Sequence, residues 1–507
     1  MTHNAKIDIE KILKNGENEL FEFKKAKDEF PREAYPTISA FANSCGGILI
    51  LGADQENGEI YPLGISNRQK IIDDMFNGLN NPQRINKNLI TNDDVMSVFY
   101  PDQNTELLLI NVRAASFKEK PIYLNGNSKN TYIRQGSGDY KCSERQIKAM
   151  IRDAAEDSYD SRGLIDYKLS DLDSESISTY LDLIKKNNPE HPFLLLSRED
   201  FLIKIGAMKR DRVKGILHCT LAGLLMFGLH SSIKEYLPHY HVEYIHKEDF
   251  LLNGKFKDRI IYDGTWGEDN LLTFFSVVQE KLFLTLNDSS AILEDGTTRA
   301  GISKLKIAIR EAFVNSIIHN DFLNNIGIKI TRYPHYIEFY NGGSLRISKY
   351  DFFKGGHSEP RNHYIQEMFR LINICERAGS GIPKILDAAT TYKLRSPELE
   401  SSFEFVKFKL WDTTVVESGL VDNPTEKEIL SFILTKTLVT RKDLDSHLSI
   451  HKNTTLKYLN SLEDKGLITK VKLEGNKYHY HLKESPHMAN YNFANTIYTL
   501  LNDLSNN

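Results

Sequence analysis

Residues 40–54 read AFANSCGGILILGAD, and this stretch decides how the first part of the chain is built. Its first half continues an apolar helical pattern that begins at Ala34. The pair Gly46-Gly47 interrupts that pattern and leads into an aliphatic run that is too short for a second helix. The run therefore predicts a buried strand. Asp54 stands at its end, where strands commonly place functional groups.

The segment LFEFK, residues 20–24, predicts a second strand. Side chains alternate along a strand, so Phe21 and Phe23 are expected to face the core while Glu22 and Lys24 face the other way. Together with later strands this predicts an α+β domain over residues 1–155. Its other expected elements are helices at 8–13 and 34–44, strands at 107–112 and 130–136, and a hairpin turn at 54–58.

A carboxylate and a lysine on one strand face suit metal-dependent phosphodiester cleavage. The carboxylate would hold Mg²⁺ or Mn²⁺, and Lys24 would steady the attacking water or the developing charge. Glu17 lies five residues before Glu22, and it joins the site only if the chain curls back from a turn before the strand. Asp54 would complete the metal site. From residue types alone, a solvated strand face with acidic turn residues remains open.

The order GENELFEFK, ISAFANSCGGILILGADQENGEIYPLGI, TYIRQGS resembles the Schlafen-type AlbA domain over nearly all of residues 1–155. The resemblance implies that Glu17, Glu22 and Asp54 form the metal site found in nuclease-active members. Those members cut tRNA and other structured RNA, whereas others bind nucleic acid or are presumed regulators. Candidate phosphate contacts are Lys24, Lys25, Lys27, Arg113 and Arg134, each of which could also be an ordinary surface cation.

Residues 304–321 predict one largely buried helix, with a core stripe at Ile309, Phe313 and Ile317. Glu311 and Asn315 are four residues apart and share a face, which His319 extends. Polar groups on such a helix need partners, and magnesium triphosphate would compensate them, with Asn315 as a metal ligand. A polar stripe that simply faces solvent is the alternative.

Two glycine clusters follow this helix, and each alone is typical of a turn or a helix cap. Their order, with RNHYIQEMF and ERAGSGIPKI, resembles a divergent GHKL-type ATP-binding domain over about residues 295–395. That family usually has an aspartate where Asn341 stands, which leaves adenine specificity open. A domain that keeps the fold without binding nucleotide is the alternative. The implied nucleotide-binding residues are Glu311, Asn315, His319, Asn341, Gly342, Gly343, Gly379, Ser380 and Gly381.

Residues 425–482 look like a winged helix-turn-helix, with its turn at 449–451. The second helix is expected to bury Leu444 and Leu448, and the third Leu456, Leu459 and Leu462. The residues expected to face nucleic acid are Lys452, Asn453, Thr454, Thr455 and Lys457 on the third helix, with Lys472 and Lys477 on the wing beside Tyr478 and Tyr480. Protein docking is the alternative use of such a module.

The whole chain of 507 residues is expected to be an α+β multidomain protein. Its expected parts are an AlbA-like domain at 1–155, a helical connector at 156–240, a GHKL-like α/β sandwich at 241–413 and a winged helix-turn-helix at 424–485. The connector shows no chemistry; its clearest helical segments are 171–187 and 220–228.

The charge and composition of the chain limit how it can bind nucleic acid and in which compartment it is expected. The net charge of −4 leaves nucleic-acid binding to local basic patches. Four cysteines without CxxC spacing read as reduced thiols, the charged N-terminus does not read as a signal peptide, and no apolar run approaches the roughly 20 residues that cross a bilayer. We therefore expect a cytoplasmic protein without membrane contact.

These patterns favour an ATP-regulated nucleic-acid-processing protein. In the first hypothesis it is a metal-dependent endonuclease for tRNA-like RNA or for DNA, and family analogy extends this to phage defence. Domains of the GHKL kind often close on ATP and pair subunits, so a homo-oligomer is expected. The alternative is a non-catalytic, ATP-responsive DNA-binding transcriptional regulator, and a third hypothesis is a protein-interaction scaffold with degenerate sites.

Overall fold

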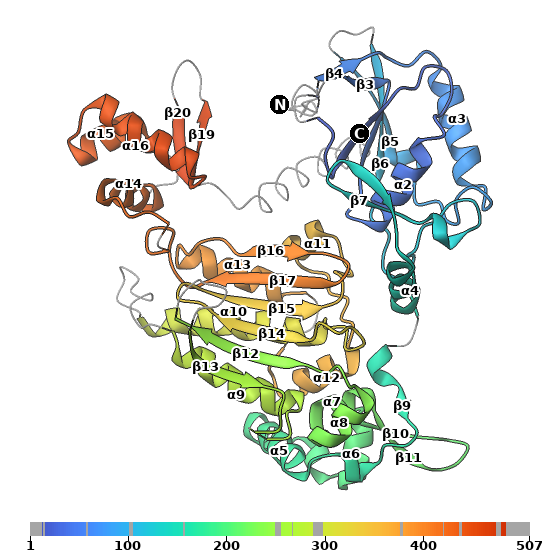
Figure 1. The fold of residues 1–507 in the computed structure, drawn as a ribbon, viewed down its shortest axis with the longest axis vertical. Coiled ribbons are helices and arrows are strands. Elements are labelled where there is room, and N and C mark those ends of the chain that lie inside the picture. Colours follow the sequence, from blue (N-terminus) through green and yellow to red (C-terminus); the bar gives the residue numbers. More distant parts are fainter. Residues whose placement is uncertain are drawn as a thin grey trace. The chain divides into compact units, whose positions relative to one another are not determined.

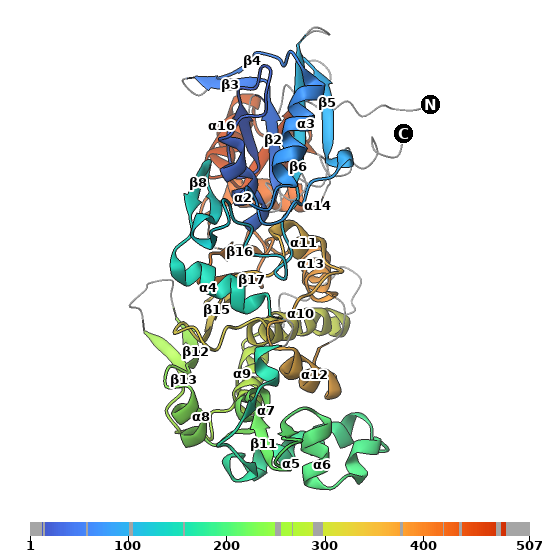
Figure 2. The ribbon, with the colours of Figure 1, turned by 90° about the vertical axis from the view of Figure 1, so that its right-hand side faces the viewer.

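The structure is a computed structural model, and its described residues form an α+β multidomain chain (Figures 1 and 2). They separate into two compact units: residues up to 155 with Arg346–Phe352, and Ser158–Leu345 with the residues from Phe353 to 482. The described residues are 13, 16–56, 59–100, 105–155, 158–248, 255–265, 267–286, 298–375, 379–418, 420–435, 439–472 and 478–482.

The first unit is built on a four-stranded sheet in the order β1-β2-β6-β5. Strand β1 runs parallel to β2, and the other pairs are antiparallel. Helices α2 and α3 supply the core on one face of this sheet. The bounds are β1 Phe21–Lys24, α2 Ala34–Asn43, β2 Gly47–Leu51, α3 Arg68–Leu79, β5 Val95–Phe99 and β6 Glu106–Val112.

The two glycines after α2 allow the chain to turn directly from this helix into the central strand. Gly46 has φ 78°, a left-handed conformation that favours glycine. A Cβ on Gly47 would lie 2.5 Å from the Phe41 ring, so helix and strand approach closely only because the side chain is missing. The predicted break between helix and buried strand is therefore confirmed.

The alternation predicted for β1 is also confirmed on its apolar side. Phe21 and Phe23 join a second small core on the sheet face opposite α2. Glu22 pairs in register with Leu49, and Lys24 with Leu51, so both polar residues lie on the face that α2 covers. Glu22 is only 4% exposed, which makes its face a buried one rather than a solvated one.

Smaller elements complete the first unit. Residues 54–56, expected within a hairpin turn, belong instead to strand β3, which pairs antiparallel with β4, and Asn57 and Gly58 lie outside the described residues. Arg346 binds Asp153 of α4 at 3.1 Å and lies over the Phe117 ring, which ties Arg346–Phe352 to this unit. The bounds are β3 Ala53–Glu56, β4 Glu59–Pro62, β7 Tyr132–Gln135, β8 Gly138–Lys141, α4 Glu144–Asp153 and α11 Lys349–Lys354.

The first part of the second unit is more than a set of helices. A three-stranded antiparallel sheet, β10-β11-β9, accompanies the helices at 163–236. Asp173 caps α5 by accepting hydrogen bonds from the backbone N–H groups of Glu175 and Ser176. The bounds are β9 Gly163–Leu164, α5 Ser174–Asn187, α6 Arg198–Lys204, β10 Met208–Arg210, β11 Leu217–Thr220, α7 Leu221–Phe227 and α8 His230–Tyr236.

The second part contains a six-stranded mixed sheet in the order β13-β12-β14-β15-β17-β16. Phe275, Phe313 and Phe369, from three different helices, form a chain of ring contacts that reaches Phe339 of β15. The bounds are β12 Val242–Lys247, β13 Phe256–Ile261, α9 Leu271–Leu284, α10 Thr298–Ile318, β14 Ile328–Arg332, β15 Tyr336–Gly342, α12 His363–Leu371, α13 Gly381–Thr391, β16 Glu398–Ser401 and β17 Phe405–Trp411.

The last described part has three helices and a three-stranded antiparallel sheet, β18-β20-β19, and the short strand β18 was not expected from the sequence. Ser449, with φ 54°, ends the second helix at the predicted turn. Leu444, Leu459 and Leu462 are buried as expected. The bounds are α14 Pro424–Thr435, β18 Val439–Thr440, α15 Arg441–Leu448, α16 Lys452–Asp464, β19 Ile468–Lys472 and β20 Tyr478–Leu482.

The phase of helix α16 differs from the prediction. Leu456 is half-buried, whereas Thr455 is fully buried and donates from its hydroxyl to Asp445 at 2.5 Å. Thr455 was expected to face nucleic acid, and this expectation is wrong because its side chain belongs to the interior. The helix expected at 8–13 lies outside the described part of the chain except for residue 13, and so do residues 376–378 and Lys477.

Candidate functional sites

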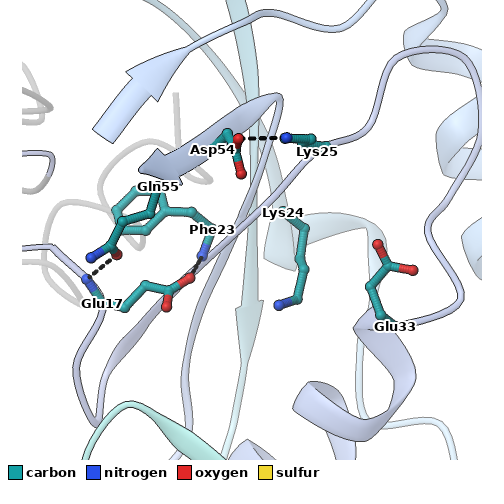
Figure 3. A pocket seen from close by; sticks show the side chains of 7 residues that line it. All are labelled: Glu17, Phe23, Lys24, Lys25, Glu33, Asp54 and Gln55. Carbon is teal, nitrogen blue, oxygen red and sulfur yellow. Dashed lines mark hydrogen bonds and ion pairs between the residues drawn. The ribbon is translucent and has the colours of Figure 1, made fainter. Parts of the chain in front are cut away.

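A hollow of about 540 Å³ lies at the edge of the first sheet, beside the end of β1 (Figure 3). It collects residues from the turn before β1, from the end of β1, from the start of α2 and from β3. Glu17 and Asp54, which are far apart in sequence, both line it, as the sequence predicted for a shared site. The full lining is Glu17, Phe23, Lys24, Lys25, Glu33, Asp54 and Gln55.

The chain curls back before β1 and so brings Glu17 to this hollow. The carboxylate Oε1 of Glu17 accepts a hydrogen bond from the backbone N–H of Phe23 at 3.4 Å. The Glu17 backbone N–H in turn donates to Gln55 Oε1 at 3.3 Å. Burial raises the pKa of Glu17, and the nearby Glu22 carboxylate raises it further. Glu17 is therefore a carboxylate whose charge a bound cation would stabilise.

Asp54 faces the same hollow from the start of the β3–β4 hairpin. Its Oδ2 lies 2.6 Å from Nζ of Lys25. The Lys25 side chain is 62% exposed, so this surface ion pair contributes little to stability and can open when another cation is present.

Glu22 has a different environment from the other two acids. Its Oε2 accepts from Arg134 Nη2 at 2.7 Å, and its Oε1 pairs with Lys24. Arg134 is buried, and its guanidinium also donates to Asp139 and to the backbone oxygens of Asn18 and Phe21. The expectation that Arg134 contacts phosphate is therefore wrong, because its side chain is only 1% exposed and its guanidinium is held by these protein oxygens.

The donor chemistry of this site suits a hard divalent cation, but the three predicted acids do not form a ready cluster. Among the residues that the structure describes, no three acidic, histidine or cysteine side chains are arranged to hold a metal. Glu17 and Asp54 line the hollow, and Lys24 and Lys25 neutralise part of its charge. Glu17 and Asp54 are thus the residues that would hold Mg²⁺ or Mn²⁺, and Glu22 could join only if Lys24 released it.

Sequence reasoning missed two contributors to this site. Glu33 brings a further carboxylate to the hollow, and Asp139 fixes Arg134 at 2.9 Å while accepting from Thr37. An acid just before a helix is common, so Glu33 carried no special signal. Asp139 follows the recognised TYIRQGS motif closely, but only the fold reveals its pairing.

The other cations named from sequence differ in their surroundings. Arg113 makes two hydrogen bonds of 2.9 Å to Glu119, and this pairing raises the pKa of Arg113. Lys27, which follows β1 in the first unit, is exposed. In the second unit, four residues of α16 are also exposed: Lys452, Asn453, Thr454 and Lys457. These exposed residues stay predicted nucleic-acid contacts.

In the second unit, Glu311 and Asn315 share one face of α10, as the spacing predicts, and His319 follows directly after the helix ends at Ile318. Glu311 is 9% exposed and lies against the start of α13: a Cβ on Gly381 would be 2.3 Å from its Oε1. The first turn of a helix stabilises a negative charge. Glu311 therefore already compensates the α13 terminus. Asn315 makes no side-chain hydrogen bond to the described residues and stays available to a ligand.

The glycines predicted to approach phosphate also meet protein atoms. A Cβ on Gly343 would lie 2.5 Å from Arg361 Nη1, and one on Gly379 would lie 2.6 Å from the backbone nitrogen of His357. Both have positive φ. Close packing within the protein thus accounts for these glycines without a nucleotide. Ser380 precedes α13 as its N-cap residue, and Gly342 ends β15.

Three polar residues that sequence reasoning did not assign join these elements. Asn320 Oδ1 accepts from the backbone N–H of Gly342 at 2.9 Å. Arg361 Nη1 donates to the backbone oxygen of His319 at 2.6 Å. Asn362 donates from Nδ2 to the backbone oxygens of residues 317, 318 and 320. The arginine–asparagine pair of RNHYIQEMF thus fastens the end of α10 beside the end of β15, which contains Asn341, itself 5% exposed.

Three regions of the chain match known family models. Residues 17–143 match "Schlafen, AlbA_2", residues 148–243 match "Domain of unknown function (DUF8451)", and residues 326–410 match "Putative ATP-dependent DNA helicase recG C-terminal". The first and third matches together indicate a nucleic-acid-related, ATP-associated protein. The middle match covers the segment that the sequence had suggested only as a helical connector.

No curated protein is significantly similar to the chain. Among solved structures, the crystal structure of the DIP2311 protein from Corynebacterium diphtheriae is similar at 17% identity and a TM-score of 0.39, covering 93% of this chain and 94% of that one. That TM-score carries no further conclusion. Within the described residues, no helix has the length and apolar character that crossing a membrane requires.

Proposed function

We propose that the chain is a metal-dependent nuclease for structured RNA or DNA, with ATP binding in its second unit as the control. The observation that supports this best is the meeting of Glu17 and Asp54 at one hollow, with Lys24 beside them. Mg²⁺ or Mn²⁺ would supply a polarised phosphate and an activated water when bound. Assignment to phage defence follows from the resemblance alone and belongs to the same proposal.

The protein's own residues have distinct tasks in this proposal. Glu17 and Asp54 would hold the cation, and Lys25 would then give up its ion pair with Asp54. Lys24 offers its ammonium group to the scissile phosphate, where negative charge develops. Arg134 and Asp139 act as positioning residues, because they fix the backbone before β1 and hold Glu22 in place. In the second unit, Asn315 would hold the magnesium of ATP.

The test is a cleavage assay on purified protein with tRNA, single-stranded RNA and duplex DNA, with Mg²⁺, Mn²⁺ or EDTA, and with or without ATP. Glu17→Gln and Asp54→Asn should each abolish cutting, because each removes a charged metal ligand. Glu59→Gln is the matched control: it is an exposed acid of the same hairpin as Asp54 that does not line the hollow. Cutting that survives both site substitutions would contradict the proposal.

One observation favours a second function, a non-catalytic DNA-binding regulator that responds to ATP. Both carboxylate oxygens of Glu22 are held by cations, so the family's third metal ligand is already compensated. In this case the first domain and the winged helix-turn-helix formed by residues 424–482 bind DNA without cutting it. Metal-independent binding to all substrates, with no cleavage under any condition, would be the outcome that selects this function.

A further inference from the structure

The segment Gly163–Thr220 has the same topology as the last described part of the chain. In each, a two-residue strand is followed by two helices and then by two further strands: β9, α5, α6, β10 and β11 in one, β18, α15, α16, β19 and β20 in the other. In each sheet the last strand is central and antiparallel to both neighbours. This arrangement, with its terminal hairpin, is that of a winged helix-turn-helix.

The hairpin of the earlier segment is strongly basic at its tip. Between β10 and β11 the sequence reads KRDRVKGI, residues 209–216, and every residue of it except Asp211 is exposed. Asp211, its one acid, accepts hydrogen bonds from the backbone N–H groups of Val213 and Lys214 at 2.8 and 3.1 Å. The acid thereby shapes the turn. The exposed cations are Lys209, Arg210, Arg212 and Lys214.

These four cations are not used to stabilise the fold. None of them forms an ion pair with the part of the chain that the structure describes; Arg210 only donates to the backbone oxygen of Gly215, within the hairpin. Val213 stands among them with 93% of its surface exposed. An apolar side chain between free cations is costly to expose to water and gains contacts when it enters a groove lined by phosphates.

The helix that would enter a major groove in such a module is less suited to nucleic acid here. Helix α6 begins with Arg198, Glu199 and Asp200, all exposed, and Asp200 accepts from the Ser197 hydroxyl at 2.6 Å. Two carboxylates at this end would repel a polyanion. The charge distribution therefore directs binding to the hairpin and away from the helix.

We infer that residues 209–216 are a nucleic-acid-binding wing, a site separate from the hollow beside β1. Lys209, Arg210, Arg212 and Lys214 contact the phosphates of a duplex, and Val213 enters the groove between them. Such binding depends on backbone charge and groove shape more than on base sequence. It does not depend on the metal site, because the hairpin belongs to the second compact unit and has its own charges. An anionic membrane is less suited, since only Val213 and Ile216 offer exposed apolar surface at the tip.

The test measures binding by the full chain to a fluorescent 30-base-pair DNA duplex and to tRNA in EDTA, so that no cleavage intervenes. The wing variant carries Lys209→Gln, Arg210→Gln, Arg212→Gln and Lys214→Gln. Its matched control removes four other exposed lysines of the second unit, with Lys185→Gln, Lys186→Gln, Lys234→Gln and Lys257→Gln. We expect roughly tenfold weaker binding for the wing variant at about 100 mM salt. The slope of the logarithm of the binding constant against the logarithm of the salt concentration should become shallower by about two to four. The control should bind nearly as tightly as the native chain.

A single substitution, Val213→Ser, should weaken duplex binding about two- to fivefold without changing the salt dependence, because it keeps every cation. Equal thermal unfolding of all variants would show that the hairpin changes leave the fold intact. The inference would be overturned if the wing variant bound nucleic acid as tightly as the native chain does. It would also be overturned if the native chain did not bind nucleic acid at all. Binding to vesicles of phosphatidylserine and phosphatidylcholine is measured in parallel, and a wing variant that loses binding to these vesicles but not to nucleic acid would also overturn the inference. Because the binding assay contains EDTA and no metal, a negative result in it does not decide whether the protein cleaves nucleic acid. A negative cleavage assay likewise does not decide whether the wing binds.

Discussion

At the residue scale, the first unit uses charge in two opposite ways. Arg134 is buried and saturated: two carboxylates and two backbone oxygens accept from its guanidinium. Glu17, in contrast, lies near another carboxylate, and both burial and this neighbour raise its pKa. The first arrangement stabilises the fold around the site. The second keeps a charge poorly compensated at the hollow, which is typical of functional sites.

Arg134→Met should strongly destabilise the first unit, because it leaves the carboxylates of Glu22 and Asp139 without their partner. We expect the free energy of unfolding to fall by about 3–5 kcal/mol, as for other broken buried pairs. Arg113→Met, at the exposed pair with Glu119, should cost only about 1 kcal/mol or less. Urea unfolding of both variants measures this, and equal losses would contradict the structural role of Arg134.

Glu17→Gln should stabilise the protein at neutral pH in the absence of metal. The folded state holds the Glu17 proton more tightly than the unfolded state, so the native carboxylate lowers stability as pH rises through its raised pKa. Below about pH 4.5, the ordinary value, both states are protonated and the two proteins should melt alike. Thermal midpoints from pH 4 to 8 test this. Added Mg²⁺ should raise the midpoint of the native protein only, and a native midpoint already above that of the variant at pH 7 without metal would refute the argument.

At the element scale, the second unit depends on close approaches between helix ends and turns. The start of α13 meets Glu311 of α10, and the asparagine and arginine before α12 bind the end of α10. These contacts fix the positions of Asn315 and of Asn341 at the end of β15. The nucleotide site proposed here is thus assembled by helix packing, and its glycines serve that packing first.

Gly381→Ala should damage this assembly, since the new Cβ would lie 2.3 Å from Glu311 Oε1. Overpacking of this kind costs about 1–3 kcal/mol, and displacement of Glu311 should also weaken ATP binding. Gly163→Ala is the control, because its Cβ would meet nothing within 4 Å. Thermal unfolding and calorimetric titration with Mg²⁺-ATP would report both effects, and an unaltered Gly381→Ala protein would contradict the packing argument.

Asn315→Ala separates ligand binding from folding. Its side chain bonds to none of the described residues, so the fold should keep its stability within about 0.5 kcal/mol. Loss of the Mg²⁺ ligand should weaken ATP binding at least about tenfold, a change of about 1.4 kcal/mol. Asn362→Ala should do the converse and destabilise the fold, because three backbone oxygens lose their donor. Unchanged Mg²⁺-ATP affinity in Asn315→Ala would remove this residue from the proposed site.

Some of this could be predicted from the sequence because it is local. Alternation placed Phe21 and Phe23 in the core, and the glycine pair marked the turn from α2 to β2. The pairing of Glu22 with Arg134 spans 112 residues, so no local pattern could reveal it. The helix phase at Thr455 and Leu456 was ambiguous for a different reason: a threonine whose hydroxyl donates to a half-buried aspartate fits the interior as well as a leucine does.

At the scale of the whole molecule, the compact units do not follow the chain order. Arg346–Phe352 belongs to the first unit although it is flanked by residues of the second. Its anchor is the ion pair between Arg346 and Asp153, whose side chains are 12% and 10% exposed. A short segment can be held by few such pairs, so each pair has a large share in holding the segment to its unit.

Arg346→Ala should lower the unfolding free energy of the first unit by about 3 kcal/mol, because the buried carboxylate of Asp153 loses its ion pair with Arg346. Adding Asp153→Asn should recover part of that loss, since a neutral amide is less costly to bury. A double-mutant cycle on the full chain measures the interaction. Strict additivity of the two substitutions would show that the pair does not act as a unit.

The same ion pair also affects when the first unit can finish folding during translation. Arg346 follows Asp153 by 193 residues, so at about 5–20 residues per second the ribosome adds it about 10–40 s after Asp153. During that interval the nascent first unit has Asp153 and the Phe117 ring without the residue that covers them. Its folding can therefore finish only after most of the six-stranded sheet has been translated, and the two units must mature together.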